Sequence, residues 1–237
     1  MNDLAIKSIA RVTKLILAPM SPLQYFLDSP GLTHVYFLEQ AYSVLENDGK
    51  ERIASFFRPY HKQIHKGLLW ADHGWKNVSH YYSKPDQEGS QNWPGATAEA
   101  QYYFNKSLSF LTKDVFKGMF FLGACLHLIQ DMCVPHHSKG IIFDGHKEFE
   151  TWATENWKKH SVTSGGLYLA FSHPSQWIEY NARISEDYYP LVSLRAKCDE
   201  ATYKEAAQSL IPLTIRTTSG FLDSMVTSLK GVTLRLE

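Results

Sequence analysis

Two histidine–carboxylate pairs stand close together in the middle of the chain, each with the carboxylate four residues after the histidine. The pairs are His127 with Asp131 and His146 with Glu150. In a helix, a spacing of four places both side chains on one face about a turn apart, so each pair could bind one cation without bending the backbone. The pattern indicates a metal site, and nitrogen and oxygen ligands make zinc the first choice.

The connector between the two pairs adds two further candidate nitrogen ligands. It reads Val134-Pro135-His136-His137. Three explanations are open for the whole cluster: a multi-zinc hydrolase, a purely structural metal site, and a set of histidines satisfied by hydrogen bonds in a helical core. Core packing alone does not explain such clustering, so we favour a metal site.

Composition excludes several classes of protein. The chain has 237 residues, enough for one substantial core, and its 24 cationic and 24 anionic side chains give no net charge. A neutral chain has no bulk attraction to nucleic acid or to an anionic membrane. The three cysteines, an odd number without a CxxC motif, indicate neither a disulfide framework nor a thiolate zinc site.

The elements that position the candidate ligands are expected to be helices. Apolar residues recur at helical spacing, whereas strand signals are sparse. Residues 72–95 are rich in Gly, Pro, Asn and Ser and predict a long loop that contains Asp72 and His80. We expect helix caps at Thr33, Asp114 and Ser172 and a kink or break at Pro212. The expected helical ranges are 34–46, 58–71, 96–111, 114–131, 146–160, 172–184 and 199–230. The prediction is an all-α single domain.

The first twenty residues differ in character from the rest. Cations at positions 7, 11 and 14 reach too far into this stretch, and its apolar run is too short, for a secretory signal. Residues 1–20 therefore predict an amphipathic segment that packs on the domain or lies on a lipid surface, and packing is the commoner fate of such a stripe. Residues 21–237 are expected to form the helical domain.

The candidate ligands lie within longer motifs. These read Phe120-Phe121-Leu122-Gly123-Ala124-Cys125-Leu126-His127 up to Asp131, then Pro135-His136-His137, then Gly145-His146-Lys147-Glu148-Phe149-Glu150. In these motifs, and over roughly residues 33–230, the chain resembles the zinc-dependent phospholipase C family, which includes bacterial phosphatidylcholine-preferring phospholipase C and the catalytic domain of clostridial alpha-toxin. S1/P1 nucleases are related. The resemblance implies an all-α, multi-helix phospholipase C / P1 nuclease-like fold with a metal cluster in a cleft.

The resemblance also implies a set of ligands. One closed zinc site would use Asp72, His80, His127 and Asp131. A second would use His137, His146 and Glu150 and keep an open position. The family holds a third zinc with a bridging aspartate, here Asp131, a histidine, here His34, and an N-terminal tryptophan that this sequence lacks at residues 21–24. Two zinc sites are therefore expected, and the third stays open. The Pro-x-His spacing favours His137 over His136.

The function implied by the resemblance is zinc-dependent hydrolysis of a phosphodiester. A phospholipase C cleaves a glycerophospholipid to diacylglycerol and a phosphorylated headgroup with a metal-activated water, and Asp72 is implied as general base and Glu150 as the carboxylate of the open site. The implied partner is a phospholipid or a membrane surface, and no protein partner is indicated. The alternatives are a single-strand nuclease or 3′-nucleotidase, which would bind nucleic acid, and a non-catalytic zinc-stabilised helical protein. Known relatives are secreted, whereas residues 1–20 do not match a signal peptide.

Overall fold

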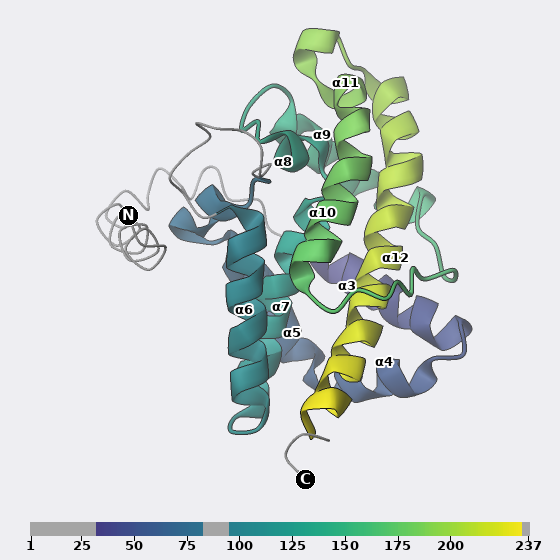
Figure 1. Ribbon diagram of the computed structural model, residues 1–237. Helices are drawn as coiled ribbons and strands as arrows, with labels where there is room; N and C mark the ends of the chain where they lie inside the picture. Colours follow the sequence, from purple (N-terminus) through teal and green to yellow (C-terminus); the bar gives the residue numbers. More distant parts are fainter. Residues whose placement is uncertain (1–31, 83–94, 234–237) are drawn as a thin grey trace.

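The structure is a computed structural model that describes residues 32–82 and 95–233. The predicted N-terminal segment 1–20 and residues 83–94 of the predicted loop lie outside the described residues. Within the described ranges all regular elements are helices and short 3₁₀ turns, with no strand (Figure 1). The all-α prediction is therefore confirmed. The helices are α3 (Leu32–Asn47), α4 (Glu51–Phe57), α5 (His61–Asp72), α6 (Ala96–Leu111), α7 (Val115–Asp131), α8 (Pro135–Lys139), α9 (His146–Asn156), α10 (Pro174–Ser185), α11 (Tyr189–Val192) and α12 (Glu200–Thr233).

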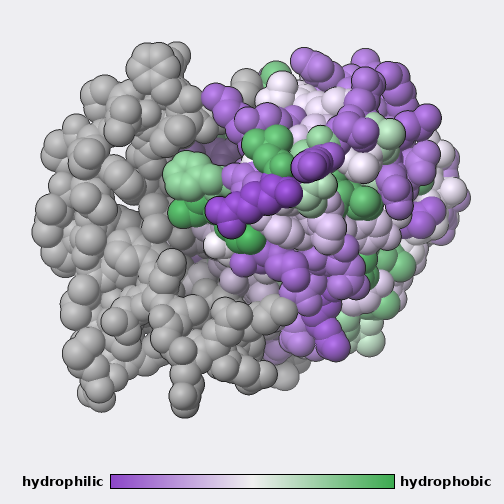
Figure 2. Space-filling view, turned by 90° about the horizontal axis from the view of Figure 1, so that it is seen from above, coloured by the Kyte–Doolittle hydropathy of each residue, from purple (hydrophilic) through white to green (hydrophobic). Residues whose placement is uncertain are grey.

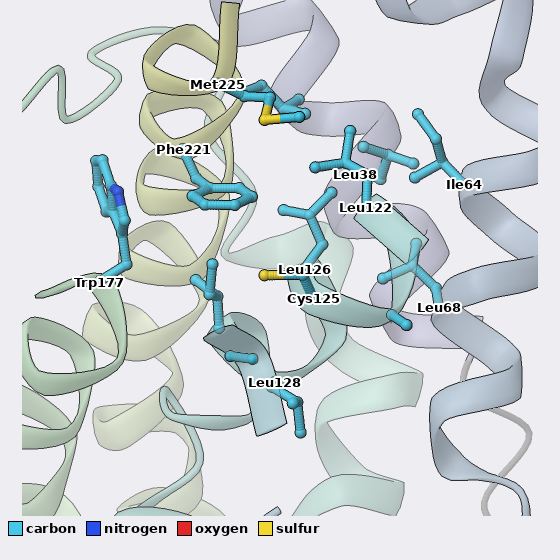
Figure 3. Close-up of a cluster of buried hydrophobic side chains, with 14 of the residues drawn as sticks. Leu38, Ile64, Leu68, Leu122, Cys125, Leu126, Leu128, Trp177, Phe221 and Met225 are labelled. Atoms are coloured by element: carbon cyan, nitrogen blue, oxygen red, sulfur yellow. The ribbon is translucent and has the colours of Figure 1, made fainter. Parts of the chain in front are cut away.

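Helix α7 is the central element because it is apolar on most of its sides. It packs against α5 and α6, and its residues from Leu122 to Asp131 are all buried. Leu122, Leu126 and Leu128 lie in one apolar cluster with side chains from other helices, among them Leu38, Ile64 and Phe221 (Figure 3). A helix so enclosed holds whatever polar side chains it carries in fixed positions.

Helices α5 and α7 approach so closely that their contact requires glycine. A Cβ added at Gly123 would lie 2.1 Å from the carbonyl oxygen of Ile64, and one at Gly67 would lie 1.9 Å from the carbonyl oxygen of Phe120. Side chains larger than hydrogen at these positions would force the helices apart. Because α5 ends at Asp72, this contact also fixes the distance from Asp72 to the end of α7.

Two of the predicted helix caps need correction, and one is confirmed. Thr33 does not cap α3 but lies inside it, and its hydroxyl bonds that of Thr154 at 2.6 Å. Helix α10 is capped at His173 rather than Ser172, because Gln176 in the first turn accepts the backbone N–H groups of both residues. Asp114 caps α7 as predicted and accepts the backbone N–H of Lys117.

Pro212 does not break the last helix. Helix α12 continues from Glu200 to Thr233 through the proline. The missing N–H of proline removes one helical hydrogen bond, but Ile211 and Ile215 on either side of it are buried against the rest of the protein. Tertiary packing therefore outweighs the local effect of the proline. None of the helices within the described ranges, α12 included, has the length and hydrophobicity needed to span a lipid bilayer.

Candidate metal centre

Four predicted ligands meet beside the C-terminal end of α7, and we call them the inner group: Asp72, His80, His127 and Asp131. His127 Nε2 lies 3.2 Å from Asp131 Oδ2 and 3.3 Å from Asp72 Oδ1. His80 Nδ1 lies 2.8 Å from Asp131 Oδ2. The pairing of His127 with Asp131 follows from their spacing in α7, whereas Asp72 and His80 arrive from other elements.

Asp72 is placed differently from the prediction. It is the last residue of α5 and not part of a loop, and residues 74–79 form a 3₁₀ helix that leads to His80. The helix continues this far because the backbone N–H of His73 still bonds the carbonyl of Trp70. Asp72 is therefore held by the rigid contact between α5 and α7.

His34 approaches the inner group from α3. Its Nε2 lies 3.4 Å from Asp131 Oδ1, and its ring packs on the ring of His127. His34 Nδ1 lies 2.8 Å from Gln130 Oε1, and the amide nitrogen of Gln130 donates to Thr218 Oγ1 of α12. An amide oxygen can only accept, so His34 Nδ1 carries the hydrogen and Nε2 is free to bind a cation.

Gln130 is a functional candidate that sequence reasoning missed. The available signal was an amide next to Asp131 in an otherwise apolar buried helix, since a buried amide needs partners. A side chain that donates or accepts at the second nitrogen of a histidine fixes its tautomer and orientation, as partners of metal-bound histidines commonly do.

The other three predicted ligands form a second cluster, which we call the outer group: His137, His146 and Glu150. His146 Nε2 lies 2.9 Å from Glu150 Oε1 and 3.0 Å from His137 Nε2, and His137 Nε2 lies 3.4 Å from Glu150 Oε1. His137 belongs to the short α8, and the other two occupy the first turns of α9. The spacing of four in α9 again brings histidine and carboxylate together.

His136 turns away from the outer group, although it is adjacent to His137 in sequence. Its Nε2 donates to the backbone carbonyl of Asp144 at 3.0 Å, and its ring stacks on that of His146. Burial lowers the pKa of His136 to about 4. The side chain that comes together with His146 and Glu150 is that of His137.

The hydrogen bonds of the outer group require a cation within it. His137 Nδ1 bonds the backbone carbonyl of His80, and His146 Nδ1 bonds that of Ile142. A carbonyl oxygen can only accept, so both Nδ1 atoms carry hydrogen, and the two Nε2 lone pairs face each other beside Glu150 Oε1. This arrangement is repulsive unless a proton or a metal ion lies between the three atoms, and a nitrogen–oxygen donor set of this kind fits zinc.

The inner group fits a cation for a similar reason. Asp131 Oδ2 is buried and close to two imidazole nitrogens, yet within the described part of the chain it makes no hydrogen bond of normal geometry. Leaving a buried carboxylate oxygen without a partner is unfavourable by about 1–3 kcal/mol or more. The donors His80, His127 and Asp72 converge as a metal-binding set, and His34, His127 and Asp131 do so as well.

Electrostatics keep the carboxylates of both groups and His127 charged, whereas burial lowers the pKa of His80. Burial alone would lower the pKa of His127, but Asp131 and Asp72 outweigh it and hold this pKa well above its usual range. Burial alone would raise the pKa of Asp131, but His127 and its neighbours hold it well below the usual range. In the outer group, His146 and His137 likewise outweigh burial and hold the pKa of Glu150 far down. Both groups thus keep their carboxylates ionised at neutral pH.

Both groups open onto one cavity of about 690 Å³. One wall is formed by candidate ligands, including Asp131, His137 and Glu150. Apolar side chains line the cavity as well, among them Phe37, Val134, Phe149, Leu210 and Ile211. The cavity is therefore suited to a ligand that has both a charged part and an apolar part.

Comparisons with known proteins agree with this architecture. The sequence profile of a family described as zinc dependent phospholipase C matches residues 33–212. The structure is similar to that of Clostridium perfringens alpha-toxin from an avian strain, with a TM-score of 0.64, 16% identity and coverage of 83% of this chain and 63% of the toxin. The alpha-toxin of Clostridium absonum gives a TM-score of 0.61 and 17% identity, covering 82% of this chain and 63% of the toxin. At such identities the likeness shows the fold, and the chain spans less than two thirds of either toxin. No curated protein matches the sequence significantly.

Proposed function

Because the chain belongs to the zinc-dependent phospholipase C family, we propose that it hydrolyses glycerophospholipids to diacylglycerol and a phosphorylated headgroup. The observation that supports this most directly is the shared cavity, which is lined both by two nitrogen–oxygen donor groups and by apolar side chains. A glycerophospholipid presents the matching pair of features, a phosphodiester next to acyl chains. Neither a structural metal site nor a set of core histidines calls for an apolar cavity beside it.

The ligand assignment belongs to the same proposal. The inner group offers four donors and would hold zinc in a closed site, whereas the outer group offers three donors and would leave a position for substrate or water. Asp131 joins the inner group to His34, because its Oδ2 faces the inner histidines and its Oδ1 faces His34 Nε2. His34 and Asp131 offer a third position, and His127 converges with them.

Zinc bound in these groups would lower the pKa of a water towards about 7 and offset the negative charge of the phosphodiester. The protein contributes the proton acceptor. Asp72 is the most exposed member of the inner group, at 21%, and its pKa stays below the usual range because His127 outweighs burial. It is therefore ionised at neutral pH, borders the cavity, and can accept the proton as water attacks phosphorus. The bond from phosphorus to the glycerol oxygen breaks, and that oxygen takes up the proton.

The proposal is tested by offering the zinc-loaded full chain phosphatidylcholine, phosphatidylethanolamine, phosphatidylglycerol and single-stranded DNA in parallel. We expect diacylglycerol and a phosphate monoester from at least one phospholipid, lost on chelation and restored by zinc. Asp72→Asn should retain the fold and lose most of the activity. Nucleotide release without diacylglycerol would show a nuclease, and zinc binding without any hydrolysis would show a non-catalytic protein.

A further inference from the structure

Exposed apolar side chains gather at the mouth of the cavity. Ile142 and Phe143 lie in the loop between α8 and α9, and Leu194 lies in the 3₁₀ turn after α11. Their exposed fractions are 55%, 78% and 51%, and all three line the cavity mouth. We call these three side chains the apolar tip. Phe143 is the most exposed large apolar side chain in the described part of the chain, and a group of such side chains at one place indicates a binding surface.

The apolar tip is held outward by a polar clamp. Asp144 accepts hydrogen bonds from Tyr189 Oη and Ser193 Oγ, both at 2.6 Å, and from the backbone N–H of Arg195. Its own carbonyl accepts the backbone N–H of Leu194 at 3.2 Å, which joins the two halves of the tip. Asp144 has a φ of +76°, a conformation that non-glycine residues rarely adopt without such support. The clamp therefore fixes the backbone of the loop next to Phe143.

Cationic side chains border the apolar tip. Lys139 and Lys147 flank the loop, and Arg195 and Lys197 flank Leu194, and all four residues are exposed. Within residues 139–148 and 194–198 these four cations outnumber two acids, the exposed Glu148 and the largely buried Asp144, whose Oδ1 lies 3.9 Å from Arg195 Nε. Seen from above, this end of the molecule shows hydrophobic side chains gathered next to strongly hydrophilic ones (Figure 2). A local positive excess on a neutral chain requires an anionic partner to be attractive.

We propose that the apolar tip and its cationic border dock the protein on a phospholipid bilayer that contains anionic lipid, with the cavity mouth facing the membrane. The tip would enter the boundary between headgroups and acyl chains, and the four cations would stay at headgroup level, where each attracts anionic lipid. This inference rests on the proposed function, because a membrane is where a phospholipid substrate is found. It adds the surface and the lipid charge that bring the substrate to the cavity.

The first experiment measures partition of the zinc-loaded full chain onto vesicles by sedimentation. Phe143→Ser should lower the partition coefficient about tenfold, since one buried apolar side chain is lost from the bilayer. Phe116→Ser is the matched control. Phe116 is also an exposed phenylalanine, but it lies in the first turn of α7, at the end of that helix away from the inner group, and does not line the cavity. Phe143→Trp should restore binding, which separates loss of the membrane contact from misfolding.

The second experiment varies the lipid charge. Vesicles of phosphatidylcholine alone are compared with vesicles that also contain phosphatidylglycerol. Binding should be stronger with phosphatidylglycerol, and the double variant Arg195→Gln/Lys197→Gln should lose most of that gain, about fivefold for each charge at low salt. The same variant should bind phosphatidylcholine vesicles as the unmodified chain does.

Three outcomes would overturn the docking proposal. The chain could fail to bind vesicles, or Phe143→Ser could bind them as well as the unmodified chain does. The third outcome is that the chain forms dimers without vesicles and that Phe143→Ser abolishes these dimers. The last would assign the tip to a protein contact. The proposed function fails separately. If vesicle binding depends on Phe143 but no diacylglycerol forms, docking holds and the reaction is wrong; if diacylglycerol forms and Phe143→Ser binds normally, the reaction holds and docking is wrong.

Discussion

The inner and outer groups use the same histidine–carboxylate spacing in two different environments. His127 and Asp131 belong to a buried helix, and their side chains are 0% and 3% exposed. His146 and Glu150 lie in the first turns of α9 at the cavity, with side chains 15% and 28% exposed. A histidine–carboxylate spacing of four therefore brings two donor atoms together but does not set how exposed they are to solvent. That exposure depends on the helix that carries the pair.

The two groups also differ in what holds them in place. The inner group depends on close apolar packing, with Gly67 and Gly123 at the contact between α5 and α7. The outer group depends on polar contacts with backbone carbonyls and on the loop clamped by Asp144. We therefore expect changes in the inner group to affect zinc binding throughout the site, and changes in the outer group to have local effects.

Asp131→Asn should have the largest effect on zinc binding, because the two carboxylate oxygens of Asp131 face different histidines. Removing one member of a buried charged set costs roughly 4 kcal/mol, which corresponds to about a 1,000-fold loss of zinc affinity. We expect lower occupancy of more than one zinc position, measured by elemental analysis after dialysis. Asp223→Asn is the control, since Asp223 pairs with Lys50 near the surface of α12. Loss of a single zinc would contradict a bridging role for Asp131.

Glu150→Gln should have a smaller and more local effect. The outer group is partly exposed, so solvent weakens the penalty of losing the carboxylate, and we expect about a 100-fold loss of affinity at one zinc position. Zinc content and thermal unfolding of the loaded protein would show this, with Glu179→Gln as the control, because Glu179 is an exposed residue of α10. Loss of all bound zinc would mean that the two groups are not separable.

Zinc binding should release protons. In the metal-free protein, Asp131 and Asp72 outweigh burial and hold the pKa of His127 well above its usual range, so zinc must displace a proton from His127 at neutral pH. Zinc affinity should therefore rise with pH, by about tenfold per unit for each proton released. Titration calorimetry in buffers of different ionisation enthalpy measures that number. Identical heats in all buffers would be inconsistent with protonated histidines in the metal-free state.

Zinc affinity should rise with pH, but the stability of the metal-free protein should fall at higher pH. The raised pKa of His127 stabilises the fold fully below the ordinary histidine pKa of about 6.5, and this contribution is lost as pH rises through the raised value. The lowered pKa of Glu150 stabilises the fold above the ordinary carboxyl pKa of about 4, and this contribution is lost as pH falls through the lowered value. Chemical denaturation of the metal-free chain should show its maximum between these limits.

Gln130→Leu should cost about tenfold in the affinity of the position that His34 serves, because His34 then loses the acceptor that fixes its tautomer. Gln130→Glu should largely restore binding, since a carboxylate accepts the same N–H. Gln208→Leu, on an exposed turn of α12, controls for the loss of an amide. Equal zinc affinity in Gln130→Leu and the unmodified chain would remove Gln130 from the site.

His136→Gln should have the smallest effect on zinc content. Comparing it with His137→Gln tests which of the two histidines is the ligand. A glutamine at position 136 can still donate to the carbonyl of Asp144, and position 136 does not face the outer group. Zinc content should stay unchanged in His136→Gln and fall by about one equivalent in His137→Gln. The reverse result would exchange the assignment of the two histidines.

Local sequence signals predicted those parts of the molecule that local contacts control. The helical range 96–111, the cap at Asp114 and the buried character of α7 were predicted from periodicity and side-chain chemistry, and the structure confirms them. The cap at Thr33 was predicted wrongly, because Thr33 lies inside α3 and bonds Thr154. Of the kink or break predicted at Pro212, the break is absent, because the buried neighbours of the proline outweigh local preference. The ligand roles remain predictions, although the residues that carry them do come together.

The sequence by itself determined the all-α fold, the family and the two helical pairs of donors, because helix periodicity and motif spacing are local properties of a chain. The tertiary structure decided which pair is buried, how Asp72 and His34 reach α7, and that Gln130 orients His34. It also decided that Phe143 stays exposed, since the clamp on Asp144 comes from residues about 45 to 51 positions away. These features depend on contacts between distant segments, and the spacing of residues within one segment does not encode such contacts.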